Sequence, residues 1–243
     1  MRNIWTISKR EIEHYLASPV AYLAAFALML IIGLIFFTNI QVAFLYTSAP
    51  SPEFIIAPIA FLLIFLVPAI TMGSIADEYK TGTLETIMTA PIRDWELIIG
   101  KWLGGVFFFS ALLLFTWVFP LILNQFIDPG IDQGILVSGY LGVFLLMAAF
   151  VSIGIFTSSL LNNSIASYFL TFAILLLLWM ISAPSQAAMT AGNEILKYLD
   201  FSEHFYPTFL SGVIDLKDVV FYLSATGVML FLGTASLEAR RWK

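Results

Sequence analysis

Residues whose types could do chemistry gather in two stretches of this chain. The first runs over residues 77–101 and reads D-E-Y-K-T-G-T-L-E-T-I-M-T-A-P-I-R-D-W-E-L-I-I-G-K. The second, residues 184–218, holds one of the two histidines, His204, among aromatic and acidic residues. Every other connection between apolar segments is short. We therefore expect function to concentrate in these two stretches, because binding residues favour loops held by a rigid scaffold.

Neither stretch carries a catalytic or cofactor motif. The chain has no cysteine, which excludes thiolate nucleophiles and Cys-based metal sites. His14 and His204 stand in neither an H-x-x-x-H nor an H-E-x-x-H pattern, so we expect no metal site and a satisfied or exposed His204. Gly100-Lys101 is followed by Trp102, and Trp95 stands where a P-loop needs its first glycine. We therefore expect no catalysis and no cofactor in this chain.

The elements that position these stretches are apolar. Of the 243 residues, 60% are hydrophobic and 11% charged, with a mean hydropathy of +0.94, against about 45–50% and about 25% in soluble domains. A soluble globular protein is excluded. Six runs are long enough to cross about 30 Å of hydrocarbon, and they contain no Asp, Glu, Lys, Arg or His. The predicted spans are 20–44, 54–76, 102–123, 135–160, 165–183 and 219–237.

Charge distribution predicts the orientation. With the N-terminus inside, nine of the eleven Lys and Arg residues are cytoplasmic, and only Lys197 and Lys217 lie outside. The first span is too long for the apolar region of a cleaved signal peptide. We expect a multi-pass protein of the cell membrane, of the bacterial cytoplasmic-membrane type, with both termini cytoplasmic.

The segment before the first span, residues 1–19, is amphipathic. A helix here places Ile4, Ile7 or Ser8, Ile12, Tyr15 and Leu16 on one stripe. Such a helix suits the membrane interface, and Ser18-Pro19 marks its junction with the span domain, 20–243.

The stretch 77–101 predicts a short helix held between spans two and three. Gly82 breaks the preceding helix, residues 83–89 form the short one, and Ala90-Pro91 ends it. Asp94 is the predicted N-cap of the helix that continues into span three. The apolar face of the short helix either lies in the membrane interface or docks in a groove of a partner.

The stretch 184–218 is too apolar for a solvated loop. Two short helices that dip into the outer leaflet or cap the bundle would bury Ile195, Leu199, Phe205, Phe209 and Leu210. Two small-residue patterns, Gly100-x-x-x-Gly104 and Gly154-x-x-x-Ser158, favour close helix packing within the chain.

These residues resemble the ABC-2 type permeases, the membrane subunits of ATP-binding-cassette transporters. Three segments carry the resemblance: I-S-K-R-E-I-E-H-Y-L-A-S-P before span one, the stretch 77–101, and Y-L-D-F-S-E-H-F through G-V-I-D-L-K-D-V-V-F-Y-L with the terminal L-E-A-R-R-W-K. Within the family the chain is most similar to short permeases of the gliding-motility and nitrous-oxide-reductase-maturation type.

The resemblance implies a fold and partners. The fold is an all-α membrane protein with six transmembrane helices, an N-terminal interfacial helix, a cytoplasmic coupling helix between spans two and three, and short outer-face helices between spans five and six. The partners are cytoplasmic ATPase subunits that bind ATP and Mg²⁺, a second copy or a related permease, an auxiliary membrane subunit and the lipid bilayer, with no nucleic acid.

The resemblance also implies site residues. By motif position the coupling pattern is matched at Glu78, Gly82, Thr83, Glu85 and Pro91, with Glu78 and Glu85 as polar contacts and Leu84, Ile87 and Met88 as apolar ones. In the family a pathway forms between spans two and five, which here would offer Thr71, Thr171, Phe172 and Trp179.

The expected function is to couple ATP hydrolysis by a separate subunit to export or conformational work. One alternative is an ion-coupled carrier, which the charge-free spans disfavour, although sodium coupling at helices broken by Pro58, Pro68 or Pro120 stays open. Another is a mechanotransmission or assembly module that transports nothing.

Overall fold

The computed structural model describes residues 2–46, 51–83, 92–126, 130–182 and 193–241. Over these ranges the chain forms helices and no strand. They are α1 (Arg2–Ala17), α2 (Pro19–Tyr46), α3 (Glu53–Thr71), α4 (Ala76–Lys80), α6 (Asp94–Thr116), α7 (Val118–Phe126), α8 (Gln133–Leu160), α9 (Ser164–Met180), α11 (Asn193–Leu199), α12 (Phe201–Phe205), the 3-10 helix η1 (Phe209–Ser211) and α13 (Leu216–Arg241).

Five helical stretches in the described ranges are long and apolar enough to cross a membrane. They are Pro19–Ala43, Glu53–Lys80, Asp94–Phe126, Gln133–Leu160 and Leu216–Arg240. The predicted fifth span, 165–183, corresponds to α9, an apolar helix of 17 residues. At 1.5 Å per residue α9 is about 25 Å long, short of the about 30 Å hydrocarbon core. The structure therefore supports five of the six predicted spans by length.

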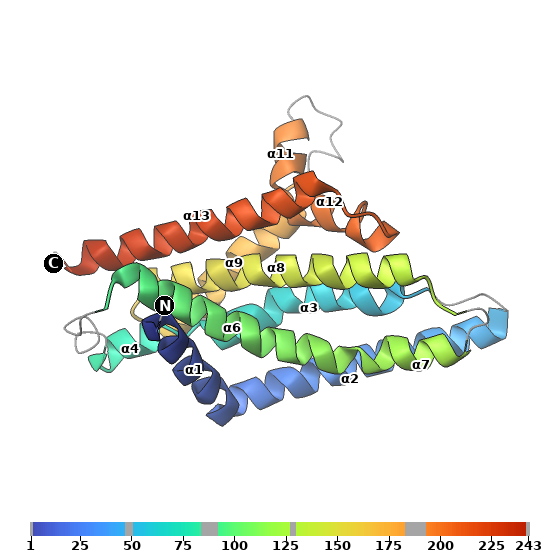
Figure 1. Ribbon diagram of the computed structural model, residues 1–243, viewed down its shortest axis with the longest axis horizontal. Coiled ribbons are helices and arrows are strands. Elements are labelled where there is room, and N and C mark those ends of the chain that lie inside the picture. The colour runs from blue at the N-terminus through green and yellow to red at the C-terminus, as the bar shows by residue number, and fades with distance from the viewer. Residues whose placement is uncertain (1, 47–50, 84–91, 127–129, 183–192, 242–243) are drawn as a thin grey trace.

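The long helices run alternately in opposite directions, with α8 in the middle (Figure 1). Both termini, α4 and the start of α6 lie toward one end of the bundle, which we call the N/C end. The start of α3, the start of α8 and the end of α7 lie at the opposite end. α8 contacts α3, α6, α9 and α13, and most of its side chains are buried. It is the central element to which the others are attached.

Helix starts follow local capping chemistry. The Asp132 carboxylate accepts hydrogen bonds from the backbone N–H groups of Gly134 and Ile135 at the start of α8, and Asn163 caps α9 in the same way. The predicted N-cap of α6, Asp94, is instead its first helical residue. Arg93 occupies the cap position, and its backbone N–H donates to the Glu96 carboxylate at 3.1 Å.

The buried face of α1 differs from the predicted stripe. Ile7, Ser8 and Tyr15 are buried as expected, but Glu11 is also buried and Leu16 is 54% exposed. The reason is that α1 packs on the start of α6, where two glycines leave room for it. The predicted stripe was based on the positions of apolar residues alone, and these do not indicate the contact between α1 and α6.

The segment from α11 to η1 folds back beside the bundle. The Ser138 hydroxyl of α8 donates to the carbonyl of Phe209 in η1 at 2.7 Å. The Phe201 ring, at the start of α12, lies 5.7 Å from the Phe150 ring of α8. Since Phe150 is 17 residues from the start of α8 and ten from its end, α12 begins near the middle of the bundle.

Candidate functional site

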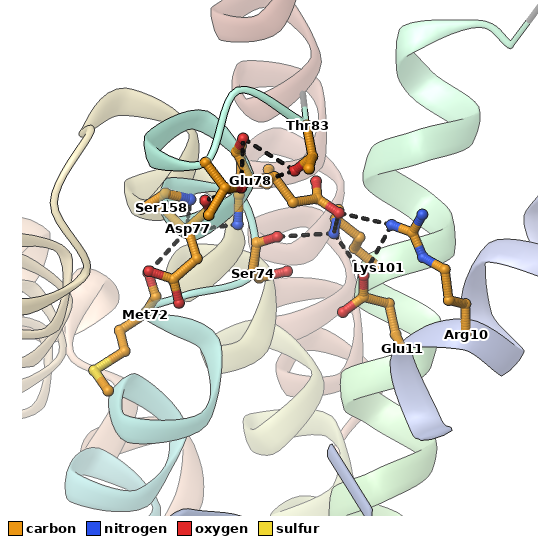
Figure 2. Close-up of polar contacts among 12 residues, drawn as sticks. Arg10, Glu11, Met72, Ser74, Asp77, Glu78, Thr83, Lys101 and Ser158 are labelled. Atoms are coloured by element: carbon orange, nitrogen blue, oxygen red, sulfur yellow. Dashed lines mark hydrogen bonds and ion pairs between the residues drawn. The ribbon is translucent and has the colours of Figure 1, made fainter. Parts of the chain in front are cut away.

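A buried lysine joins three helices at the N/C end. The Lys101 side chain is 1% exposed, and its Nζ lies 2.5 Å from Glu11 Oε1 and 3.0 Å from Glu78 Oε1. It also donates to the carbonyl of Ser74 at 2.7 Å. Figure 2 shows these contacts converging from α6, α1, α4 and the turn before α4.

Arg10 adds a second cation. Its Nη2 lies 2.6 Å from the same Glu78 Oε1 that Lys101 contacts. We call Arg10, Glu11, Ser74, Glu78 and Lys101 the Lys101 cluster. Ion pairs in such a buried setting are strong, because little water screens them, and removing one partner leaves an uncompensated charge. The cluster therefore fixes α1, α4 and α6 relative to one another.

Some polar atoms in and beside the Lys101 cluster are buried without a hydrogen-bond partner. Among the described residues, Glu78 Oε2, Ser74 Oγ and Tyr15 Oη are buried without a hydrogen-bond partner. Burial, followed by the nearby charge of Glu11, raises the pKa of Tyr15 well above its usual range. Tyr15 is therefore a neutral phenol against a charged cluster.

The turn before α4 is attached to α8 by one serine. Ser158 Oγ accepts hydrogen bonds from the N–H groups of Ile75 and Ala76 and donates to the carbonyl of Met72, each at 3.0 Å. One turn earlier, Gly154 lies against the Thr71 side chain, where any Cβ would overlap it. The Gly154-x-x-x-Ser158 pattern thus packs this turn onto α8, as expected for contact within the chain.

The other small-residue pattern receives α1. A Cβ on Gly100 would lie 2.7 Å from Ile7 Cγ2, and one on Gly104 would lie 2.6 Å from Glu11 Cβ. The Ser8 hydroxyl donates to the carbonyl of Gly100 at 2.9 Å. The two glycines therefore let α1 approach α6 closely enough for Glu11 to reach Lys101.

The predicted coupling segment follows directly from α4. Gly82 has a φ of +73°, a left-handed conformation that glycine adopts without strain. The Thr83 hydroxyl donates to the carbonyl of Glu78 at 3.2 Å, which folds the chain back over α4. The remaining predicted contacts, Leu84, Glu85, Ile87, Met88 and Pro91, lie outside the described residues.

A cavity of about 570 Å³ adjoins this segment. Its walls combine charged and hydroxyl-bearing side chains of α1, α4 and the turns on either side of α4: Arg10, Glu11, His14, Ser74, Asp77, Glu78, Thr81 and Thr83, together with Gly73. The N/C end thus has a hollow beside the start of the predicted coupling segment, lined by residues that carry polar groups.

Comparison with known protein families identifies the chain. Residues 5–241 match the family described as ABC-2 family transporter protein. The chain belongs to the ABC-2 transporter family. A search of curated proteins found no match. Membership makes the chain a multi-pass membrane component of an ABC transporter, from a family that normally works with ABC ATPase partners and is not itself catalytic.

The four predicted pathway residues of this ABC-2 protein fall into two environments. Thr71 and Thr171 are fully buried, and the Thr171 hydroxyl lies 2.5 Å from that of Thr157 in α8. Both pack within the α3, α8 and α9 contact. Phe172 instead lies 5.1 Å from the Phe65 ring of α3, and Trp179 lies 6.4 Å from the Phe150 ring.

His204 is a satisfied buried residue. Its Nδ1 lies 2.6 Å from Asp218 Oδ1 and its Nε2 lies 2.8 Å from the carbonyl of Tyr198. Both ring nitrogens therefore have a polar partner within hydrogen-bond distance. In the part of the chain that the structure describes, no three His, Cys, Asp or Glu side chains form a group that could hold a metal.

Sequence reasoning did not identify Arg10, Glu11, Lys101 or Ser158 as site residues. Lys101 was assigned to the end of a loop, and Glu11 was given no role in α1. One signal was available, because Glu11 stands four residues after Ile7 and four before Tyr15, on the stripe itself. A carboxylate on an apolar stripe indicates a buried partner.

Proposed function

We propose that this chain is the permease subunit of an ABC transporter and that its N/C end faces the cytoplasm, where a separate ATPase docks on the segment after α4. The observation that carries the proposal is the Lys101 cluster. Its residues Ser74 and Glu78 come shortly before the segment that the family resemblance assigns to ATPase coupling, and Lys101 comes shortly after it. The cluster also connects α4, which precedes that segment, to α1 and α6 at this end.

Movement of the docked ATPase would reach the bundle along two routes. One runs from Glu78 to Lys101 and Glu11, and so moves α6 and α1. The other runs from the turn before α4 through Ser158 to α8, and from Asp77 through its hydrogen bond with Ser164 to α9. Because each contact is a hydrogen bond or ion pair of defined geometry, a push on α4 displaces packed helices rather than a flexible loop.

In this proposal ATP and Mg²⁺ are bound by the ATPase, and a second permease, identical or related, completes the membrane pathway. The transporter exports a substrate or performs conformational work on a partner at the opposite end. An ion-coupled carrier would need no ATPase, and a non-transporting module would show ATP turnover without flux, so the two alternatives give different results in the same preparation.

The test uses the tagged full chain purified from membranes together with its associated proteins. We expect an ABC ATPase to copurify and its ATP turnover in proteoliposomes to depend on the permease. Glu78→Gln keeps the size and acceptor oxygen of residue 78 but removes the charge that faces Lys101 and Arg10. We expect it to lower permease-dependent turnover by about fivefold, equivalent to about 1 kcal/mol.

Glu13→Gln is the matched control. Glu13 is also on the N/C end, in α1, but its side chain is 65% exposed, and within the described part of the chain its ion pair is with Lys9 at 3.8 Å. We expect it to leave turnover unchanged. The proposal would be contradicted if no ATP-hydrolysing subunit copurified. Equal ATP turnover with Glu78→Gln and with the unmodified chain would also contradict it.

A further inference from the structure

A second cavity lies beside the end of α9, in the part of the bundle where α12 folds back. It has a volume of about 310 Å³ and is lined by Phe61, Trp179, Met180, Ser182, Asp200 and Glu203, among others. This volume is at the lower end of the about 300–1,000 Å³ range of small-molecule sites. Its walls are aromatic and thioether groups on one side and carboxylates with hydroxyls on the other.

The cavity is an open hollow at the level of the middle of the bundle. Asp200 precedes Phe201, whose ring contacts Phe150 near the middle of α8, and the Trp179 ring also contacts Phe150. α9 ends here after about 25 Å, which is less than the hydrocarbon thickness. Carboxylates at such a depth are costly in a membrane protein and usually serve a ligand or an ion.

Asp200 is a buried acidic residue of the cavity wall. The residue is 1% exposed, and its two carboxyl oxygens accept hydrogen bonds from the N–H and hydroxyl groups of Ser182 and Ser202. All four donors are neutral. Among the described residues no Lys, Arg or His forms an ion pair with Asp200. The cavity wall therefore includes an acidic group whose hydrogen-bond donors in the described part of the chain are neutral.

An aromatic strip leads along the bundle to this cavity. Phe61 and Phe65 of α3 lie 5.6 Å apart, Phe65 lies 5.1 Å from Phe172 of α9, and Phe172 stacks with Tyr168 at 6.2 Å. Phe61 is 42% exposed and Phe65 is 37% exposed. These rings form an apolar face that ends in a carboxylate-lined hollow.

We propose that the cavity binds an alkylammonium group and that the apolar chain attached to this group lies along the aromatic strip. A cation is favoured by Asp200 and Glu203 and by the ring faces of Trp179 and Phe61, which attract ammonium groups. An anion would be repelled by the same carboxylates. An uncharged headgroup would leave the charge of Asp200 without a counter-ion. That this ligand is the transported substrate rests on the proposed function. The binding of the ligand to the cavity does not rest on it.

The experiment measures binding of hexyltrimethylammonium to the purified full chain in dodecyl maltoside by equilibrium dialysis, without an ATPase. We expect saturable binding that Glu203→Gln weakens by about tenfold, because a charge at the site is lost. Phe61→Leu keeps an apolar side chain but removes a ring, and we expect a loss of about threefold. Because Phe61 is half-exposed, this second variant tests the site even where Glu203→Gln fails to fold.

Glu194→Gln is the matched control. Glu194 is an exposed carboxylate of α11 that does not line the cavity, so its loss tests a general effect of surface charge. We expect unchanged binding for this variant and no competition from hexanol or hexanoate. Equal binding by the unmodified chain, Glu203→Gln and Phe61→Leu, competition by hexanol as strong as by the cation, or no saturable binding would each overturn the proposal.

The ammonium group could belong to a soluble amphipathic amine or to a lipid headgroup. Adding phosphatidylethanolamine to the micelles separates the two sources. Competition with hexyltrimethylammonium assigns the site to the lipid, and unchanged binding assigns it to the soluble cation. Because no ATPase is present, failure of this experiment leaves the coupling proposal intact, and failure of ATPase coupling leaves the binding result intact.

Discussion

At the scale of single residues, Lys101 has the most consequential position in the structure. Its side chain is almost fully buried, and two carboxylates and a backbone carbonyl surround its Nζ. The sequence placed it at the boundary between a loop and a span, a usual position for a lysine that follows the positive-inside rule. Its burial depends on Glu11, which is 90 residues away in the chain, and no local pattern predicts such a contact.

Removal of Lys101 should therefore be much more damaging than its position near a helix start suggests. We expect Lys101→Met to destabilise the protein by about 3–5 kcal/mol, because it removes the buried cation that contacts both Glu11 and Glu78 and leaves only the half-exposed Arg10 beside them. Glu11→Gln in the same chain should recover part of this loss, so that the double variant is more stable than the sum of the two single effects predicts. Denaturant titration of the purified variants in mixed micelles measures the four stabilities.

A double-mutant cycle at Lys9 and Glu13 provides the comparison for the coupling energy between Lys101 and Glu11. These side chains are 68% and 65% exposed and 3.8 Å apart, and exposed pairs of this kind contribute about 0.2–1 kcal/mol. Coupling energies of equal size in the two cycles would show that burial of Lys101 does not matter for stability.

At the scale of elements, sequence patterns predicted which segments are helices better than how they pack. The apolar runs marked α2, α3, α6, α8 and α13, since a run of that length and composition has few other stable conformations in a membrane. The break at Trp117 between α6 and α7 has a local cause, because Thr116 stands four residues before Pro120, which has no N–H to donate to the Thr116 carbonyl. Pro120 was among the three prolines named as possible helix breaks, whereas Pro58 and Pro68 lie inside α3 without ending it.

The packing of α1 on α6 shows the same limit. Gly100 and Gly104 were correctly assigned to helix packing within the chain, but the helix that they receive was not identified. The glycines give room for Glu11, and Glu11 reaches the buried lysine. The amphipathic character of α1 thus serves a contact with α6.

Substitution of Gly104 tests this contact. We expect Gly104→Ala to displace α1, because its Cβ would lie 2.6 Å from the Glu11 side chain. Tryptic cleavage after Lys9 and Arg10 in an otherwise folded protein should become faster by about tenfold, since an undocked helix is more often unfolded. Loss of an N-terminal tag on a time course measures it.

Gly227→Ala is the control for that substitution. A Cβ on Gly227 of α13 meets no atom within 4 Å, so alanine should only improve helix propensity, by about 1 kcal/mol. Unchanged tryptic cleavage in both variants would mean that α1 does not need close approach to α6.

At the scale of the whole molecule, the charge-free spans have a different meaning from the one the sequence indicated. The predicted span boundaries contain no ionisable residue, yet Asp200, His204 and Asp218 from the segments around them are buried. The chain brings these groups in through α12 and the start of α13, which fold against α8. Ionisable residues can thus lie inside a bundle whose spans lack them, because a connecting segment folds back.

The position of the termini bears on the number of crossings. Both termini lie toward the same end of the bundle (Figure 1), and a chain that ends on the side where it began crosses the membrane an even number of times. Five helices in the described ranges meet the length criterion, and we expect α9 to supply a sixth crossing. A helix as short as α9 can cross the membrane if a neighbouring segment covers the end of the helix. α12 is such a segment, because it contacts α9 and lines the cavity at the end of α9.

The resulting topology can be tested directly, because the chain has no cysteine of its own. Single-cysteine variants Lys9→Cys, Glu194→Cys and Glu238→Cys place one thiol each at an exposed position of α1, α11 and α13. We expect a membrane-impermeant maleimide to label the thiol at 194 in intact cells, and those at 9 and 238 only after the membrane is permeabilised, as the positive-inside rule requires. Labelling of 9 and 238 from opposite sides would mean five crossings, and α9 would then lie within the membrane without spanning it.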